Sequence, residues 1–458
     1  MRVTPKRELS LFDSTCIIVG IIIGAGIYQM APDIARGAGS WWGVVAIWIV
    51  GGLLSLAGAL SYAELATAYP QEGGDYVYLT KAYGRWAGFL FGWAQLTVVR
   101  PGDIAIMAFA FATYGRAIYD PLAAHPGVSQ RLFAGAAVLV LTIINILGVK
   151  QGKWTQNLLT TAKALGLLAI VGVAVAAPRG AGTAVAEAGS LPVTLALIFV
   201  LFTYGGWNEM AYVAAEVKDP RRNIVRALVV GTAAVIALYL LVNGAFLYTL
   251  GYKGLAGSKA VASEAIGTVF PAVGSRLISA LVCISALGAV NGLIFTGARI
   301  SYAVGEDHRL FRALGRWDPR TGTPVWALAV QGLIALSLIL SFGGYIDAIL
   351  YTAAAVYAFY LGTSLSVIVL RFREPDVERP YKVTGYPVTP LIFSGVCLFL
   401  IYSSLDYAKN VKPISLIVLA AALGLGIVIY IVTAILGWNR TSDQPAVQPP
   451  GGFSSDVQ

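Results

Sequence analysis

The sequence predicts an all-α integral membrane protein with twelve transmembrane helices, and three observations lead to that fold class. Of the 458 residues, 57% are hydrophobic and 12% are charged, whereas soluble domains carry roughly 25% charged residues. Apolar runs of about 20 residues, long enough to cross a bilayer, recur along the chain. Lys and Arg gather in alternate connecting segments. So few charges cannot cover this apolar surface in water, so the surface must face lipid.

Twelve apolar runs are expected to form the helices, and they leave no room for a separate soluble domain. They lie near residues 11–35, 41–69, 86–114, 132–149, 155–177, 191–217, 224–250, 273–304, 325–342, 345–370, 386–406 and 413–436. Residues 1–440 are therefore expected to form one transmembrane domain. The segment 441–458 is rich in Pro, Gly, Ser and Gln, which predicts a disordered cytoplasmic tail.

The distribution of basic residues predicts the orientation in the membrane. With the N-terminus in the cytoplasm, roughly two thirds of the 32 Lys and Arg residues fall in cytoplasmic segments. Both termini are therefore expected in the cytoplasm, with the chain in the cell membrane. The net charge of +9 follows from this topology. The lipid bilayer is the expected surrounding, and no nucleic-acid partner is expected.

Residues for catalysis and metal binding are scarce. The chain has two His and three Cys, without a metal-ligand cluster or a nucleophile and base converging in one span. We therefore expect neither an enzyme nor a metal or other cofactor. Cys16, Cys283 and Cys397 lie in apolar runs and are expected to be small buried hydrophobic residues. A channel is also disfavoured, because rings of charge and repeated filter segments are missing from the sequence.

Two helices are expected to be broken near their middle. Gly24-Ala25-Gly26 interrupts the first span and Tyr204-Gly205-Gly206 interrupts the sixth. The second break lies five spans after the first. An odd offset inverts the second unit relative to the first, as in inverted-repeat transporters. Free N–H groups at a break suit a carboxylate and free C=O groups suit an ammonium, so an amino acid satisfies both. The alternative is that these glycines only permit close helix packing.

Several motifs, in order along spans one to ten, carry a family resemblance. The stretch 22–28 resembles G-(S/A)-G-I-F, 61–65 with 73–76 resembles Y-A-E-L…G-G-D-Y, and 202–208 resembles a sixth-span signature. Further matches are Arg100-Pro101, Asn291-Gly292, and Glu378-Arg379-Pro380-Tyr381-Lys382-Val383. The chain thus resembles the L-type amino-acid transporters of the amino acid, polyamine and organocation superfamily.

The resemblance implies a sodium-independent transporter of L-amino acids, usually an exchanger. It implies the LeuT-type five-plus-five inverted repeat with broken helices one and six. The repeats would cover about 11–177 and 191–370, and two additional helices would lie within 386–436. Proton-coupled uptake of amino acids or polyamines stays open as an alternative, as does an amino-acid sensor without transport. The sequence does not identify the amino acids carried.

Mapped by motif, the substrate site is expected at the two breaks. The resemblance places the substrate carboxylate at the backbone of Gly24, Ala25 and Gly26, and the amine at the carbonyls of Ile22 and Phe202. Phe202 would also gate the site, and glycines in the sixth span would leave room for the side chain. The expected substrate-contacting residues are Ile22, Gly24, Ala25, Gly26, Phe202, Tyr204, Gly205, Gly206 and Glu209. Many family members have Ser in place of Ala25, so a hydroxyl contact would be missing here.

Lys163 lies about nine residues past Trp154 in the fifth span, hence about 13 Å into the bilayer. A buried ammonium is expensive there, so one interpretation is that the side chain extends back to the interface. The family suggests another, in which the ammonium bridges spans one and eight where sodium-coupled relatives hold a sodium ion. That arrangement would make external sodium unnecessary.

Other ionisable and amide residues within the spans have less certain roles. Glu209 could attract a cationic substrate or bind a proton, or merely pair with a neighbouring helix. Arg100 and Asp103 are three residues apart and are expected to pair as a structural brace. Glu64 and Glu216 lie at inner helix ends, where they could close a cytoplasmic gate with basic loops. Gate or structural roles are expected for Glu64, Arg100, Asn208, Glu216 and Asn291.

The resemblance also bears on partners. Eukaryotic members tether a heavy subunit through a Cys between spans three and four, and residues 115–131 contain no Cys. We therefore expect a stand-alone protein of bacterial type, without a disulfide-linked heavy subunit.

Overall fold

The computed structural model describes residues 6–176, 189–271, 273–341, 345–411 and 413–438. Within these ranges, eleven helices are long and apolar enough to cross a membrane, and a shorter apolar helix, α14 (Val325–Ser341), falls in the remaining expected position. The all-α prediction with twelve apolar helices is confirmed. The predicted tail, 441–458, lies outside the described residues.

The helical elements follow one another with short connections, and their bounds are as follows. They are α1 (Leu11–Ile22), α2 (Gly26–Gln29), α3 (Ala31–Ala38), α4 (Trp41–Ala68), α5 (Asp75–Tyr83), α6 (Arg85–Ala94), the π-helical turn η1 (Gln95–Val99), α7 (Arg100–Ile118), α8 (Pro126–Leu147), α9 (Val149–Ala176), α10 (Val193–Thr203), the 3₁₀ segment η2 (Trp207–Glu216), α11 (Pro220–Gly257), α12 (Val261–Gly267), α13 (Gly274–Asp307), η3 (Arg309–Phe311), α14 (Val325–Ser341), α15 (Tyr345–Arg373), α16 (Val388–Val411) and α17 (Pro413–Ile435).

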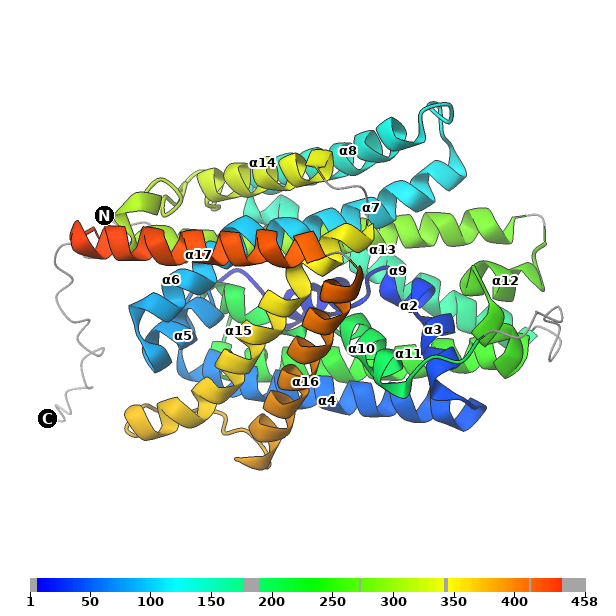
Figure 1. Ribbon diagram of the computed structural model, residues 1–458, viewed down its shortest axis with the longest axis horizontal. Coiled ribbons are helices and arrows are strands. Elements are labelled where there is room, and N and C mark those ends of the chain that lie inside the picture. Colours follow the sequence, from blue (N-terminus) through cyan, green and yellow to red (C-terminus); the bar gives the residue numbers. More distant parts are fainter. Residues whose placement is uncertain (1–5, 177–188, 272, 342–344, 412, 439–458) are drawn as a thin grey trace, which may run out of the picture.

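Helix α1 lies at the centre of the bundle, where it packs against α9, α11, α13 and η2 (Figure 1). Burial follows this arrangement. In the most apolar window of each span, 78% of residues 11–29 are buried and 72% of α13 are buried, but only 17% of α17. Large exposed side chains such as Leu165, Leu333 and Ile417 cover the outer helices. The outer faces are therefore suited to lipid, and the polar side chains are kept for the interior.

The first interrupted helix begins with a regular cap and ends early. Ser10 and Asp13 form a capping box at the start of α1, which satisfies two otherwise free N–H groups. The helix stops at Ile22, and the chain resumes helical geometry at Gly26 in α2. The break therefore falls where the glycines predicted it.

The second interrupted helix is broken between α10 and η2, over Tyr204–Gly206. Gly206 has φ +107°, and a Cβ there would lie 2.8 Å from the Ile21 side chain of α1. Both the backbone conformation and the close approach of the first break require glycine at this position. The two breaks are thus packed against each other, and the chain places both predicted interruptions at the centre of the bundle.

One end of the bundle carries the start of α1 and the end of α17, and we call it the termini face (Figure 1). Leu9 forms a short parallel bridge with Val217 there. The N–H of Leu9 donates to the carbonyl of Glu216, and the N–H of Lys218 donates to the carbonyl of Leu9, each at 2.9 Å. The segment before the first interrupted helix is thereby tied to the end of the second.

Candidate functional site

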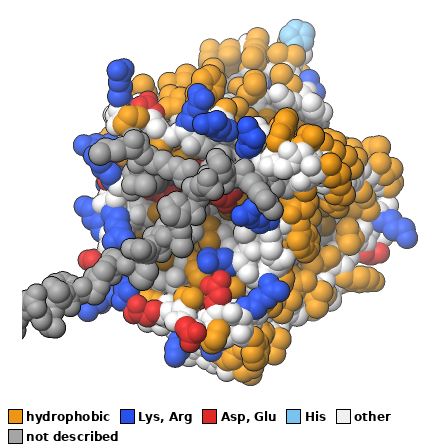
Figure 2. Space-filling model, turned by 90° about the vertical axis from the view of Figure 1, so that its left-hand side faces the viewer, with side chains coloured by type: hydrophobic (Ala, Val, Ile, Leu, Met, Phe, Trp, Pro, Cys, Tyr) orange, Lys and Arg blue, Asp and Glu red, His pale blue; other side chains and the backbone are white. Residues whose placement is uncertain are grey.

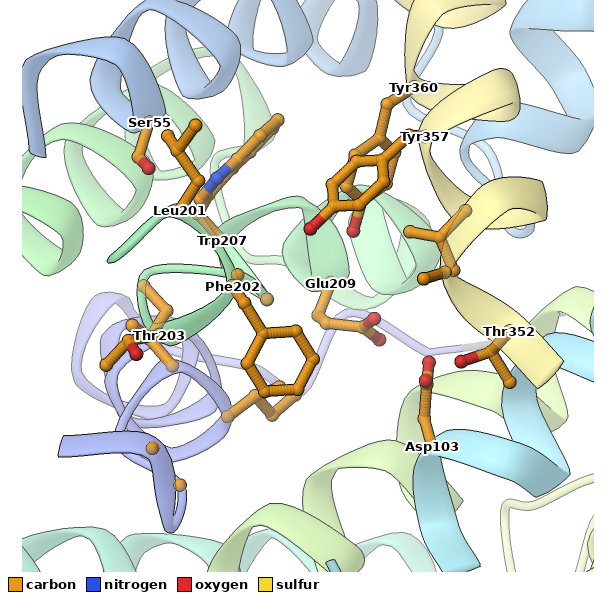
Figure 3. A pocket seen from close by; sticks show the side chains of 18 of the residues that line it. Ser55, Asp103, Leu201, Phe202, Thr203, Trp207, Glu209, Thr352, Tyr357 and Tyr360 are labelled. Carbon is orange, nitrogen blue, oxygen red and sulfur yellow. The ribbon is translucent and has the colours of Figure 1, made fainter. Parts of the chain in front are cut away.

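A cavity of about 140 Å³ lies at the two breaks, between α7, α15 and α16 (Figure 3). Its volume is close to that of a cavity of about 150 Å³ that admits one benzene molecule. Of the predicted substrate-contacting residues, those that line it are Ile22, Gly24, Gly26, Phe202, Gly205, Gly206 and Glu209. The predicted site is therefore a cavity, built from helices far apart in sequence.

The backbone of the first break presents free donors. Gly24 donates its N–H to the Ile22 carbonyl at 2.8 Å. Among the described residues, no acceptor is recorded for the N–H groups of Ala25, Gly26 and Ile27, which begin α2. Unpaired N–H groups at the start of a helical segment carry partial positive charge. The free donors are therefore those of residues 25–27, one residue later than the 24–26 that the motif implied. Gly24 lines the cavity without a side chain, which leaves space there.

The carbonyl groups of the breaks are partly occupied. Ile22 accepts a hydrogen bond from the Tyr239 hydroxyl at 3.0 Å, and Phe202 accepts one from the Gly205 N–H at 3.0 Å. A carbonyl oxygen has two lone pairs, so the Phe202 carbonyl retains acceptor capacity, whereas the Ile22 carbonyl already accepts both the Tyr239 hydroxyl and the Gly24 N–H. Figure 3 shows the Phe202 ring between Thr203 and the acidic side chains of the cavity.

Two residues of the predicted set do not line the cavity. Tyr204 is fully buried, and its hydroxyl donates to the Trp48 carbonyl at 3.2 Å. Its ring packs against Trp48 and Tyr239. Ala25 is also fully buried. Assigning a substrate contact to the Tyr204 side chain was wrong, because this residue anchors the break to α4 instead of facing the cavity.

Lys163 does not extend back to the interface. Its ammonium donates three hydrogen bonds, to the carbonyls of Gly20 at 2.7 Å, Ile23 at 2.9 Å and Ser285 at 2.9 Å. Every proton of the charged group is used. The predicted bridge between spans one and eight is confirmed, since Gly20 and Ile23 belong to the first span and Ser285 to α13. A Cβ on Gly288 would stand 2.7 Å from this ammonium, so glycine makes room for it.

Arg100 pairs with Glu209 across the cavity wall. The Arg100 Nη1 lies 3.0 and 2.9 Å from the two Glu209 oxygens, and the side chains are 3% and 6% exposed. The Thr296 hydroxyl also donates to Glu209. The prediction that Arg100 pairs with Asp103 was wrong. Glu209 thus pairs with a neighbouring helix and also lines the cavity.

The π-helical turn η1 directly precedes Arg100. Pro101 lacks an N–H and so leaves a carbonyl of the preceding turn without its usual donor. The chain accommodates this with a wider turn in which Arg100 N–H bonds to the Gln95 carbonyl. Widening a turn rotates the residues that follow it relative to those before.

Sequence reasoning missed one side of the cavity. Asp103, Thr352, Tyr357 and Tyr360 line it opposite the breaks. Figure 3 shows the Asp103 carboxyl and the Thr352 hydroxyl facing the same space. An ionisable residue inside a span was a usable signal for Asp103. The α15 residues gave no such signal, because Thr and Tyr are common in membrane helices.

The two predicted asparagines are structural. Asn208 donates to the Tyr212 hydroxyl at 2.9 Å and accepts from Tyr360 at 2.8 Å. Asn291 donates to Gln156 and to the Gly152 carbonyl, and accepts from Asn145. The bonds of Asn208 join η2 to α15, and those of Asn291 join α13 to α8 and α9.

Glu64 and Glu216 both form buried ion pairs toward the termini face. Glu64 accepts two hydrogen bonds from Arg371, at 2.8 and 2.6 Å, and one from the Val383 N–H at 2.6 Å. Glu216 pairs with Arg299 at 2.7 Å. Arg299 lies on α13, so the partner of Glu216 is a helical residue and not the loop residue that was expected.

Asp75, at the start of α5, forms a further buried link on this side. It accepts hydrogen bonds from the hydroxyls of Tyr62 and Thr363. Burial raises the pKa of Asp75 to about 6, against the lowering effect of these hydroxyl donors. Helices α4, α5 and α15 are thus joined around one carboxyl group.

Interrupted helices around a central cavity, in a bundle of membrane-spanning length, define a membrane transporter and not an enzyme. Comparison with known proteins makes this more specific. A family model described as amino acid permease matches residues 9–432. The chain belongs to this amino acid permease family.

Two groups of relatives agree with the family. The chain is 33% identical to the b(0,+)-type amino acid transporter 1 of Mus musculus over 409 residues, covering 86% of this chain and 82% of the relative. It is 31% identical to the Homo sapiens protein of the same name, over 96% and 91% of the two chains. It is 33% identical to the large neutral amino acids transporter small subunit 2 of Oryctolagus cuniculus, over 85% and 74%. The resemblance to L-type amino-acid transporters is confirmed, and amino-acid transport is the function of the family.

Proposed function

We propose that this chain is a sodium-independent exchanger of L-amino acids that works by alternating access. The observation that carries the proposal is the position of the Lys163 ammonium, between the first break and α13. A cation at this point supplies positive charge that a sodium ion would otherwise bring. Because the lysine is part of the chain, it cannot be released with the substrate, so a sodium gradient has nothing to act on.

The same cavity supports a placement for the substrate. Its carboxylate would bind at the free N–H groups of Ala25 and Gly26, where the start of α2 favours an anion. Its ammonium would bind the remaining lone pair of the Phe202 carbonyl, and it would reach the Ile22 carbonyl only by replacing the Gly24 N–H there. The Phe202 ring would then cover the bound molecule, and the side chain would extend into the rest of the cavity. This arrangement uses both ends of an amino acid at once.

The basic residues support the proposed orientation. Figure 2 shows Lys and Arg side chains spread over the termini face. By the positive-inside rule, that face lies in the cytoplasm of a cell whose membrane holds the chain. The buried pairs of Glu64 and Glu216 would then close the cytoplasmic side. All three cysteines are free and buried, which suits a chain that works without a disulfide-linked subunit.

A counterflow experiment tests the proposal. The full-length protein is purified and placed in liposomes that are either loaded with unlabelled L-amino acids or empty. Labelled L-amino acids are added outside at equal pH, with choline in place of sodium. Uptake only into loaded vesicles, unchanged when sodium is added, supports the exchanger. Uptake into empty vesicles that grows with an imposed proton gradient would make the protein a proton-coupled importer. Absence of uptake in every condition would overturn the transport proposal.

A further inference from the structure

One wall of the cavity carries an acidic group without a partner. Asp103 is partly exposed to the cavity. Among the described residues, it forms no hydrogen bond and no ion pair. A carboxylate inside a membrane protein is costly unless a cation or donor compensates it. Asp103 interacts with Arg100 only through space, without a direct bond. It therefore lacks a directly bound donor or cation, which a ligand in the cavity could supply.

The charges around the cavity do not cancel without a ligand. Glu209 also lines the cavity, but Arg100 already binds both of its oxygens. Arg100 holds Glu209 through Nη1 and forms no hydrogen bond or ion pair with Asp103, although it is the nearest basic residue in sequence to Asp103. Lys163 gives its three protons to backbone carbonyls outside this wall. Asp103 and Glu209 both line the cavity and are acidic. Arg100 supplies one positive charge beside these two carboxyl groups.

Aromatic rings lie beside the acidic group. Tyr357 and Tyr360 of α15 line the same wall, with ring centroids 6.3 Å apart. The Tyr360 hydroxyl is occupied with Asn208, and Tyr360 also packs on Trp207. Aromatic faces attract ammonium and guanidinium groups, more strongly where water is excluded. An acid and two tyrosines therefore form a surface whose chemistry fits a cation.

We propose that Asp103, with Tyr357 and Tyr360, is the side-chain subsite, and that it selects L-amino acids with a cationic side chain. The inference rests on the proposed function, since it uses the breaks for the backbone groups of the substrate. Figure 3 shows Phe202 between Thr203 and Asp103. The backbone groups at the breaks, which would bind the substrate's α-carboxylate and α-ammonium, thus lie at one end of the cavity. Asp103, which would bind the substrate's side chain, lies at the other. A lysine or arginine substrate would reach from the breaks to Asp103. Its carboxylate would meet N–H groups at the breaks, and its cationic side chain would meet the Asp103 carboxylate.

The test compares substrate preference in three variants of the full-length protein in liposomes. Initial rates of exchange are measured for labelled L-arginine and L-leucine, with putrescine as a cation that lacks a carboxylate. Asp103→Asn removes the charge and keeps the size. As controls, Asp33→Asn and Asp120→Asn each remove a carboxylate that pairs with an arginine outside the cavity, Arg36 and Arg116 respectively.

The wild-type protein is expected to prefer L-arginine to L-leucine, and to carry putrescine poorly. Asp103→Asn should raise the KM for L-arginine by about tenfold or more, while the KM for L-leucine stays within about twofold. The two controls should leave the ratio of these constants unchanged. A KM for L-arginine that stays constant in Asp103→Asn, or rises equally for both substrates, overturns the inference and leaves exchange intact.

Two other outcomes also count against the subsite. Asp103→Asn could abolish uptake driven by a proton gradient without changing substrate preference, in which case the carboxyl binds a proton instead of a substrate. Loss of all exchange by the wild-type protein would reject the proposed function itself. L-leucine exchange by the wild-type protein distinguishes the two failures. It is observed if only the subsite is wrong, and it is missing if the proposed function is wrong.

Discussion

The buried pair of Arg100 and Glu209 allows a sharp prediction of stability. Glu209→Gln keeps the shape of the side chain but leaves the Arg100 guanidinium, 3% exposed, without its bidentate carboxylate. Removing one partner of a buried ion pair costs about 3–5 kcal/mol, because the remaining charge has lost its compensation. We expect a decrease of that size in the free energy of unfolding.

The chain offers a matched control on its surface. Arg221 and Glu378 also form two hydrogen bonds, from Nη1 and Nη2 of the arginine at 2.9 and 2.7 Å, with side chains 66% and 68% exposed. Water and salt compensate these charges when the pair is broken, so Glu378→Gln should change the free energy of unfolding by no more than about 1 kcal/mol. The comparison isolates burial, since the chemistry of the two substitutions is identical.

Unfolding is followed by tryptophan fluorescence as sodium dodecyl sulfate is added to the protein in mild detergent micelles. The double variant Arg100→Gln with Glu209→Gln provides a second check, because removing both charges should cost less than the sum of the single changes. Equal stability of the Glu209→Gln and Glu378→Gln variants would refute the argument. Additive effects in the double variant would show that the two charges do not interact.

Three further predictions concern the rest of the network. Lys163→Ala and Gly288→Ala should both lose or slow exchange in liposomes while the protein stays folded by size-exclusion chromatography, because each displaces the same ammonium; undiminished exchange in either contradicts this. Glu64→Gln should speed hydrogen exchange of the Val383 amide, which donates to that carboxylate; an unchanged rate would show that the contact does not protect it. The Asp75 carboxyl has a pKa raised from 3.8 to about 6, so the stability that its protonated form contributes is present below about pH 3.8 and is lost as pH rises through about 6. Melting temperature should therefore fall over that pH range, and Asp75→Asn should flatten the fall; parallel profiles for the two proteins would exclude Asp75 as the cause.

The sequence predicted the helices and their breaks because both signals are local. Twenty apolar residues in a row are visible without knowledge of neighbours, and the interruption at Gly206 needs a conformation that only glycine adopts readily. The depth of Lys163 in its span left two interpretations open, and the family resemblance supplied the one that the hydrogen bonds show. The helix ends were less accurate, since α11 extends from Pro220 to Gly257, beyond the apolar run that identified it.

The partners of the cavity residues could not be predicted in the same way. Arg100 and Glu209 are 109 residues apart in sequence, and the nearer Asp103 was the simpler choice on helical spacing alone. Arg100 instead pairs with a residue of η2, and one sequence does not reveal which distant helix lies beside it. Tyr204 was misassigned for a related reason, because a residue beside a break can face either the cavity or the neighbouring helix. Packing between distant helices decides each of these cases.

The three hydrogen bonds of Lys163 also have a mechanical consequence. Moving the first span away from α13 at the level of Ile23 and Ser285 would break charge-assisted bonds worth about 1.5–3 kcal/mol each. Rotating the two helices about this point would preserve them. In the proposed exchanger, the lysine would therefore be a pivot about which the two helices rotate without losing these bonds. Segments on either side of the pivot would then move in opposite directions, so that opening one entrance would close the other.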